Sequence, residues 1–243
     1  MMELGLNPLK IISYRFLFRF LKERKRFMQL GGGSVKFYPI LDDYNGDAGP
    51  IKSHYFHQDL LVASFIYEKK PKRHIDVGSR VDGFVAHVAS FRKIEVFDVR
   101  PLELKTYDNI DFVQADLMSE NFIHENICDS ISCLHAIEHF GLGRFNDPID
   151  PLGHIKGLNN FFKMLEPDGI LYLSYPIGKS AVYFNAYRVF DPLSIFNWIE
   201  NKFLLDRFDY INDEGNLVKN VNPDELQKQK YGYGCGIYTL KKL

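Results

Sequence analysis

The sequence predicts an α/β fold in which helices cover both faces of a mostly parallel, seven-stranded sheet. Short apolar segments alternate with helical patterns from about residue 57 onward, an order typical of strand–helix–strand units. A turn containing Gly78 joins the first strand directly to a helix, as at the start of nucleotide-binding α/β units. The polar residues 211–234 carry no convincing helix before the last strand, so that strand is expected to be antiparallel.

The individual elements follow from the spacing of apolar residues and from turn residues. Pro71 is expected to end the first helix, and Pro167-Asp168-Gly169 to turn the chain into a strand. Strands are predicted at 74–77, 94–98, 110–114, 129–134, 170–175, 203–210 and 235–241. Helices are predicted at 57–69, 82–91, 101–106, 119–125, 152–165 and 192–201.

The chain is expected to consist of an N-terminal extension, 1–50, and a main domain, 51–243. Residues 9–26 form a basic amphipathic pattern in which Arg15 and Arg19 interrupt any signal-peptide core. Such a helix suits peripheral contact with an anionic inner-membrane surface, or packing on its own domain or over a substrate cleft. Residues 31–50 are predicted to be a loop with a short strand at 35–40.

Composition excludes several classes of protein. The 243 residues carry 30 basic and 31 acidic side chains, a net charge of −1, which argues against a general nucleic-acid binder. Three cysteines without paired spacing favour a reducing, cytoplasmic environment over a disulfide or zinc-finger framework. No apolar run approaches the roughly 18 residues of a membrane span.

The most informative segment is 74–83, in which a short strand, a glycine turn and a helix follow one another. Such a turn lets a ligand approach the backbone at the start of a helix. Asp98 ends the next strand, twenty residues after Gly78. An acid at this spacing is placed to accept hydrogen bonds from ribose hydroxyls.

These motifs, in their order, resemble the S-adenosylmethionine-dependent methyltransferase superfamily. Asp76-Val-Gly78 looks like the glycine-rich motif of that superfamily. Ala115-Asp116-Leu117 resembles the motif whose acid approaches the adenine amino group, and Glu138-His139 resembles the Glu-His pair just beyond the fourth strand. Segment 158–176 resembles its helix, Pro-Asp-Gly turn and fifth strand. The chain also resembles an uncharacterised methyltransferase-like family found beside surface-polysaccharide genes, through 74–84 and 135–151.

The resemblance implies S-adenosylmethionine as cofactor and a small-molecule or glycan acceptor, through O-methylation of a sugar or sugar phosphate. Arg80 departs from the usual motif, which has glycine there. The guanidinium is expected to pair with the methionine carboxylate; the alternative is that it fills the site. The implied cofactor-binding residues are Asp76, Gly78, Ser79, Arg80, Gly83, Asp98, Val99, Arg100, Asp116, Leu117 and His135.

His139 is predicted to be the general base because its ordinary pKa lies near 6.5, with Glu138 orienting it and Arg188 binding an acidic group of the substrate. A structural role for His139 and a surface ion pair for Arg188 are the alternatives. His135-x-x-Glu138-His139 also matches an inverted zinc-protease motif, but the first histidine still belongs to a strand. No metal site is predicted, although His135, His139 and nearby aspartates are an alternative set of ligands.

Two other functions remain open at this point. Arg80 is compatible with a non-catalytic binding module that keeps the fold and has lost the cofactor. The glycine turn and Asp98 are shared with nicotinamide-dependent dehydrogenases, although the Pro-Asp-Gly turn and the long final hairpin argue against that class. Oligomeric state is not indicated by the sequence.

Overall fold

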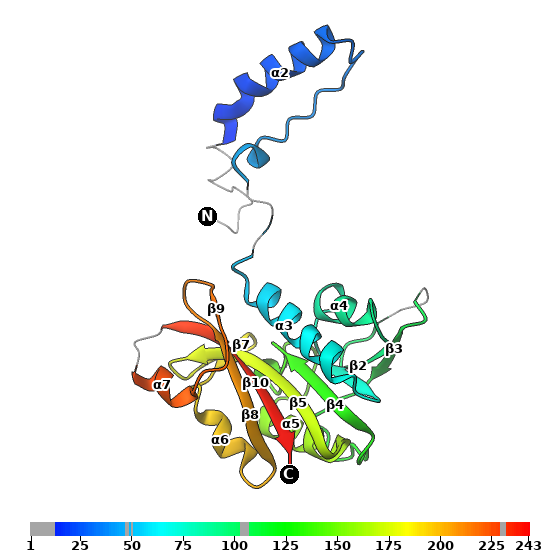
Figure 1. Ribbon diagram of the computed structural model, residues 1–243, viewed down its shortest axis with the longest axis vertical. Helices are drawn as coiled ribbons and strands as arrows, with labels where there is room; N and C mark the ends of the chain where they lie inside the picture. The colour runs from blue at the N-terminus through cyan, green and yellow to red at the C-terminus, as the bar shows by residue number, and fades with distance from the viewer. Residues whose placement is uncertain (1–12, 47–48, 50, 103–106, 229–231) are drawn as a thin grey trace. The chain divides into compact units, whose positions relative to one another are not determined.

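The computed structural model describes residues 13–46, 49, 51–102, 107–228 and 232–243. The chain divides into two compact units, Met1–Pro50 and Ile51–Leu243. The larger unit contains an eight-stranded sheet and a separate hairpin of β6 (Ala181–Tyr183) and β7 (Tyr187–Val189) (Figure 1). None of the helices in the described residues is both long and apolar enough to cross a membrane.

The α/β prediction with a mostly parallel sheet is confirmed. The first five strands pair in parallel, and β10 is antiparallel to both neighbours. The count differs, because a two-residue strand, β9, extends the sheet beyond β8. The strand order is β3 (Ile110–Gln114), β2 (Ile94–Asp98), β1 (His74–Val77), β4 (Cys128–Leu134), β5 (Leu165–Gly178), β10 (Tyr233–Lys242), β8 (Phe203–Ile211) and β9 (Leu217–Val218).

Helices cover both faces of this sheet and bury one apolar cluster on each side (Figure 1). Val62 and Ile66 pack with Ile94 on one face, while Phe161 and Ile195 belong to the cluster on the other. Complete burial of such side chains stabilises a fold by about 1.5–3 kcal/mol each. The helices are α3 (His54–Lys69), η4 (Val81–Val85) and α4 (Ala86–Ala89) on the first face, and α5 (Gly153–Met164) and α6 (Ser194–Ile199) on the second.

Several predicted elements differ from the observed ones. Residues 119–125 form a turn at 120–121 followed by coil, in place of a helix, and the Ser119 hydroxyl accepts the Asn121 N–H at 3.2 Å. Serine hydroxyls compete with helical hydrogen bonds in this way. Residues 35–40 are described as coil and form no strand. The predicted loop 211–234 contains β9 and a short helix, α7 (Pro223–Lys228). Most of the predicted helix at 101–106 lies outside the described residues.

The smaller unit contains the described part of the predicted N-terminal helix. A 3₁₀ turn, η2 (Tyr14–Phe16), leads into α2 (Leu17–Gln29), whereas residues 9–12 lie outside the described range. Within this unit the Tyr44 hydroxyl donates to Glu23 at 2.6 Å, and the rings of Phe20 and Phe37 meet edge to face at 5.6 Å. The helix therefore packs against the 35–45 segment that follows it.

Candidate active site

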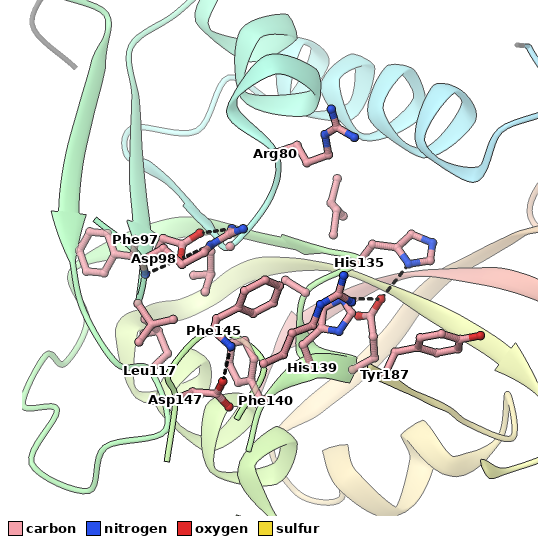
Figure 2. A pocket seen from close by; sticks show the side chains of 18 of the residues that line it. Arg80, Phe97, Asp98, Leu117, His135, His139, Phe140, Phe145, Asp147 and Tyr187 are labelled. Atoms are coloured by element: carbon pink, nitrogen blue, oxygen red, sulfur yellow. Dashed lines mark hydrogen bonds and ion pairs between the residues drawn. The ribbon is translucent and has the colours of Figure 1, made fainter. Parts of the chain in front are cut away.

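A cavity of about 470 Å³ lies at the carboxyl ends of β1, β2, β3 and β4. The strand order changes direction at β1, which pairs with both β2 and β4, and ligands of open α/β sheets bind at such a switch point. Figure 2 shows the labelled side chains of the cavity wall, which come from several separate loops. The volume is within the range of sites for small ligands and cofactors.

The turn after β1 brings bare backbone to the cavity wall. Gly78 has a φ of +72°, and a Cβ there would lie 2.9 Å from the Cβ of Ala136. Its N–H donates to the carbonyl of Phe97 at 3.0 Å, which ties the turn to β2. A residue with a side chain at this position would have a strained backbone conformation, and its Cβ would clash with Ala136.

Asp76 and Ser79 stabilise this turn through buried hydrogen bonds. The buried Asp76 carboxylate accepts the Ser79 N–H at 3.1 Å, the Ser79 hydroxyl at 2.7 Å and the Ser132 hydroxyl at 2.6 Å. Burial raises the pKa of Asp76 to about 7 despite these hydrogen bonds. Within the described part of the chain, neither residue is among those that line the cavity, so both act on the shape of the turn.

Gly83 also lies away from the cavity wall formed by the described residues. It has non-helical dihedral angles inside η4, and a Cβ there would lie 3.0 Å from the Asp59 carboxylate. Its absence of a side chain therefore allows η4 to approach α3. This contact gives Gly83 a packing role, and its contact with a cofactor stays a prediction.

Arg80 lies at the edge of the cavity and leaves it open. Its guanidinium forms an ion pair with Asp82 at 2.7 Å, and 64% of the side chain is exposed. The same group lies 6.0 Å from the centre of the Tyr55 ring. Figure 2 shows Arg80 near the top of the view, separate from His139 and Tyr187.

Asp98 ends β2 and is engaged by Arg100. The backbone N–H and Nε of Arg100 donate to Oδ1 of Asp98 at 2.8 and 2.9 Å, and its Nη2 donates to Oδ2. The guanidinium also lies 4.6 Å from the centre of the Phe145 ring. Both residues and Val99 line the cavity. A carboxylate has about four acceptor positions, so one position on Oδ2 is left for a ligand hydroxyl.

Asp116 and Leu117 follow β3 and line the same cavity. One oxygen of Asp116 accepts the Met118 N–H at 2.9 Å, which fixes the carboxylate at the start of the turn. Phe97, Leu117 and Met118 supply apolar wall beside it. An acid next to an apolar slot suits a flat heterocycle that carries an amino group.

The loop after β4 places His135, Glu138 and His139 on the cavity wall. His135 Nδ1 lies 2.8 Å from Oε1 of Glu138, whose side chain is only 1% exposed. His139 Nδ1 lies 2.6 Å from the carbonyl oxygen of Ala186. Burial lowers the pKa of His139 below its ordinary value, although Glu138 acts in the opposite direction. His139 is therefore placed to be neutral.

The arrangement does not meet the geometry of the inverted zinc-protease motif. His135 has a φ of +50° and precedes the 3₁₀ helix η5 (Ile137–His139), so the two histidines are not one turn apart on an α-helix. Figure 2 shows His135 and His139 on different parts of the cavity wall.

Arg188 lies away from the cavity wall among the described residues. Its buried guanidinium donates to the carbonyl oxygen of Phe140 at 2.6 Å and makes longer contacts, of 3.3–3.4 Å, to the carbonyls of Glu138, Asp150 and Pro151. Since all these acceptors are backbone atoms of the loop after β4, the placement favours a structural role over the predicted catalytic one.

The cavity also includes residues beyond the predicted catalytic and cofactor-binding ones. Phe145 and Phe140 follow the Glu138-His139 pair, and Tyr233 comes from the last strand. His54 and Tyr55, the first two residues of α3, lie in the segment before the first strand. Tyr233 could not be found from local pattern, because its approach depends on the insertion of β10 beside β5.

The fold of the larger unit is shared with solved methyltransferases. The chain aligns with the N-methyltransferase NodS of Bradyrhizobium japonicum WM9, solved with S-adenosyl-L-homocysteine, at 13% identity, TM-score 0.52, over 81% of this chain and 89% of that one. An O-methyltransferase of a trans-AT PKS multienzyme of Brevibacillus brevis, also solved with S-adenosyl-L-homocysteine, aligns at 12% identity, TM-score 0.54, over 76% and 71%. The 1,6-didemethyltoxoflavin-N1-methyltransferase of Burkholderia thailandensis aligns at 14% identity, TM-score 0.51, over 76% and 78%.

A family model matches residues 89–232, more than half of the chain. The chain therefore belongs to the family described as "Caenorhabditis protein of unknown function, DUF268". No curated protein matches its sequence.

Proposed function

We propose that this protein is an S-adenosylmethionine-dependent methyltransferase that acts on a small polar acceptor. The observation that carries the proposal is that one cavity joins the bare Gly78 turn, the carboxylates of Asp98 and Asp116, and the imidazole of His139. The three solved methyltransferases of the same fold, all with S-adenosylhomocysteine in their crystals, support the choice of cofactor.

The residues of the cavity fit that cofactor in chemistry. Phe97 and Leu117 offer apolar surface for the adenine ring, and Asp116 an acceptor for its amino group. Asp98 offers an acceptor for a ribose hydroxyl. Gly78 leaves room for the chain that links ribose to sulfur, since a Cβ there would fill the approach to Ala136.

Arg80 is the proposed partner of the methionine carboxylate. Its present ion pair with Asp82 is mostly exposed, and exposed pairs contribute little to stability because water and salt screen them. A bound carboxylate therefore competes with Asp82 at little cost. The planar guanidinium binds a carboxylate through two parallel hydrogen bonds.

When bound, S-adenosylmethionine supplies an activated methyl group for an in-line displacement. The chain's own task is to align the acceptor and remove its proton. His139 donates from Nδ1 to the Ala186 carbonyl, so Nε2 carries the lone pair that accepts the hydroxyl proton. Glu138 Oε1 lies 3.8 Å from this Nε2 and stabilises the imidazolium that forms. Such a base contributes about 10²–10⁴ in rate.

A sugar or sugar-phosphate hydroxyl, in the assembly of a surface glycan, is the proposed acceptor. The resemblance to a family found beside surface-polysaccharide genes supports this choice. Arg144 and Tyr187 line the cavity, and the Arg144 guanidinium donates at 3.2 Å to the Ala186 carbonyl oxygen that also contacts His139. An arginine there suits a phosphate, and a tyrosine suits sugar hydroxyls.

A cytoplasmic location with peripheral contact at the inner membrane surface is proposed for the same enzyme. The three cysteines are free and buried, in keeping with a reducing compartment. The described part of the 9–26 segment combines basic residues with Phe18 and Leu21, which are 84% and 42% exposed. Basic residues beside exposed apolar ones suit an anionic lipid surface.

The test is calorimetric titration of the full chain with S-adenosylmethionine and S-adenosylhomocysteine, followed by product assays with a panel of sugar phosphates. Binding at micromolar or lower Kd, and transfer of a labelled methyl group to one class of acceptor, are expected. A folded chain that binds neither compound overturns the proposal. Binding of reduced nicotinamide in their place, seen by its fluorescence, assigns the cavity to a dehydrogenase.

A further inference from the structure

Three potential metal ligands meet beside the cavity from distant parts of the chain. The donor atoms of His54, His135 and Cys235 all lie within 4.8 Å of one another. His54 is the first residue of α3, His135 directly follows β4, and Cys235 lies on β10. Two imidazoles and a thiol are the donor set that borderline-soft cations prefer.

His135 is oriented as a ligand histidine would be. Its Nδ1 lies 2.8 Å from Glu138 Oε1, and a ligand imidazole typically donates its second nitrogen to a carboxylate. Its Nε2 is buried and has no hydrogen-bond partner among the described residues, and only 7% of the side chain is exposed. A bound cation would give this buried nitrogen a partner.

The backbone supports the same conclusion. His135 has a φ of +50°, a left-handed conformation that is uncommon for residues other than glycine. The backbone N–H of His135 donates to both the carbonyl oxygen of Ser174, at 3.0 Å, and the Ser174 hydroxyl, at 3.1 Å. Strain of this kind persists where the surroundings fix a side chain for a purpose, and here it fixes the imidazole against Cys235 and His54.

Aromatic rings lie beside the cluster. The His54 and His135 rings stack at 5.5 Å between centroids, Tyr55 lies 5.1 Å from His135, and Tyr233 lies 5.7 Å from His54. Such a shell limits access of water and strengthens the bonds between a metal and its ligands.

We propose that His54, His135 and Cys235 bind one zinc ion and leave its fourth position open to the cavity. Three protein ligands and one exchangeable position are typical of catalytic zinc sites. Donor atoms of a tetrahedral site lie about 3.5 Å apart, so the present cluster needs only small side-chain movements. The Cys235 thiol gives up its proton to solvent as the zinc–sulfur bond forms. Mg²⁺ and Ca²⁺ are disfavoured because they require oxygen donors.

The proposal does not depend on the cofactor, because His54 and His135 line the cavity whichever ligand occupies it. An open metal position there would coordinate an oxygen or nitrogen of the molecule that binds. Zinc lowers the pKa of a bound water to about 7, so a coordinated hydroxyl would lose its proton more readily.

The test is titration of the full chain, stripped of metal by a chelator, with Zn²⁺ alone and with Co²⁺ alone. One equivalent of each is expected to bind, and Co²⁺ is expected to give a thiolate-to-cobalt charge-transfer band. Cys235→Ala should abolish this band and lower zinc affinity at least tenfold. Cys133→Ala is the matched control, because Cys133 is equally buried but lies in β4 outside the cluster.

Two further variants test the zinc site if Cys235→Ala fails to fold. His54→Gln changes a half-buried residue at the start of α3 and should weaken zinc binding at least tenfold. Glu138→Gln should weaken it by about 10–100-fold as the partner of a ligand histidine. Absence of zinc binding to the folded chain, or a cobalt complex without a thiolate band, overturns the proposal. Titration with S-adenosylmethionine of the same metal-free protein tests the cofactor separately.

Discussion

His139 Nδ1 lies 2.6 Å from the carbonyl oxygen of Ala186, on the loop between β6 and β7. Because a carbonyl oxygen can only accept, this contact assigns the ring proton to Nδ1 and the lone pair to Nε2. Burial keeps the pKa of His139 below its ordinary value, so the imidazole is neutral near pH 7. The hairpin of β6 and β7 thus fixes the tautomer that a general base requires.

His139→Gln is expected to lower kcat of the proposed methyl transfer by about 10²–10⁴, since the variant cannot accept a proton. The Kd for S-adenosylmethionine should stay unchanged, because His139 serves the acceptor. His87→Gln is the control: His87 is an exposed histidine on α4. Steady-state rates and calorimetry measure the two effects, and equal kcat in both variants would exclude His139 as the base.

Asp98→Ala is expected to weaken binding of S-adenosylmethionine by about 10–100-fold, because hydrogen bonds to a charged group contribute about 1.5–3 kcal/mol. Asp111→Ala removes an exposed carboxylate that pairs with Lys93, the residue before the neighbouring strand β2, and should leave affinity unchanged. Calorimetric titration of both variants with S-adenosylmethionine measures the two affinities. Unaltered affinity in Asp98→Ala would show that Arg100 keeps this carboxylate from the ligand.

Arg80→Gly separates a working cofactor site from a blocked one. If Arg80 holds the methionine carboxylate, the variant should bind S-adenosylmethionine about tenfold more weakly. Binding of 5′-methylthioadenosine, which lacks that carboxylate, should be the same in both proteins. Tighter binding of S-adenosylmethionine to the variant would instead favour the non-catalytic binding module, in which the arginine obstructs the site.

Sequence pattern located the parts of the site that lie close together along the chain. Asp98 ends a parallel strand, Asp116 and Glu138 follow the ends of two others, and such ends meet at one edge of a sheet. Cys235 and His135 are a hundred residues apart, and their meeting depends on β10 lying beside β5. No local periodicity carries that information.

Arg188 illustrates a second reason why part of the site could not be predicted from the sequence. An arginine after the fifth strand is equally compatible with a substrate ligand and with a structural donor. The choice is made by backbone carbonyls of Phe140 and its neighbours, which converge on the guanidinium only after the loop has folded. Backbone acceptors have no sequence signature, so the structural role could not be predicted.

Arg188→Met is expected to lower the free energy of unfolding by about 1–3 kcal/mol, because it removes the donor of the Phe140 carbonyl oxygen together with the longer contacts to neighbouring carbonyls. Arg188→Lys should lose less, since an ammonium still donates to one or two of them. Urea denaturation measures both. A fully stable Arg188→Met protein with impaired kcat would return Arg188 to the reaction itself.

His74 and Asp76 make opposite contributions to the dependence of stability on pH. His74 is buried between the hydroxyls of Ser130 and Ser132, at 2.8 and 3.1 Å, and burial lowers its pKa to about 3. Burial raises the pKa of Asp76 to about 7, so ionisation of Asp76 costs stability as the pH rises from its ordinary pKa. The two effects overlap near pH 5, and a variant is needed to separate them.

The variant His74→Gln isolates the contribution of His74 to the pH dependence of the free energy of unfolding. Because the folded pKa lies below the ordinary value of 6.5, the contribution of neutral His74 is complete above that pH and is lost as the pH falls from 6.5 toward 3. Each pH unit in this window costs about 1.4 kcal/mol. Between about pH 7.5 and pH 5 the native chain should therefore lose about 2 kcal/mol more than the variant, as measured by urea denaturation. Parallel losses in the two proteins would show that His74 accepts a proton in the folded state without penalty.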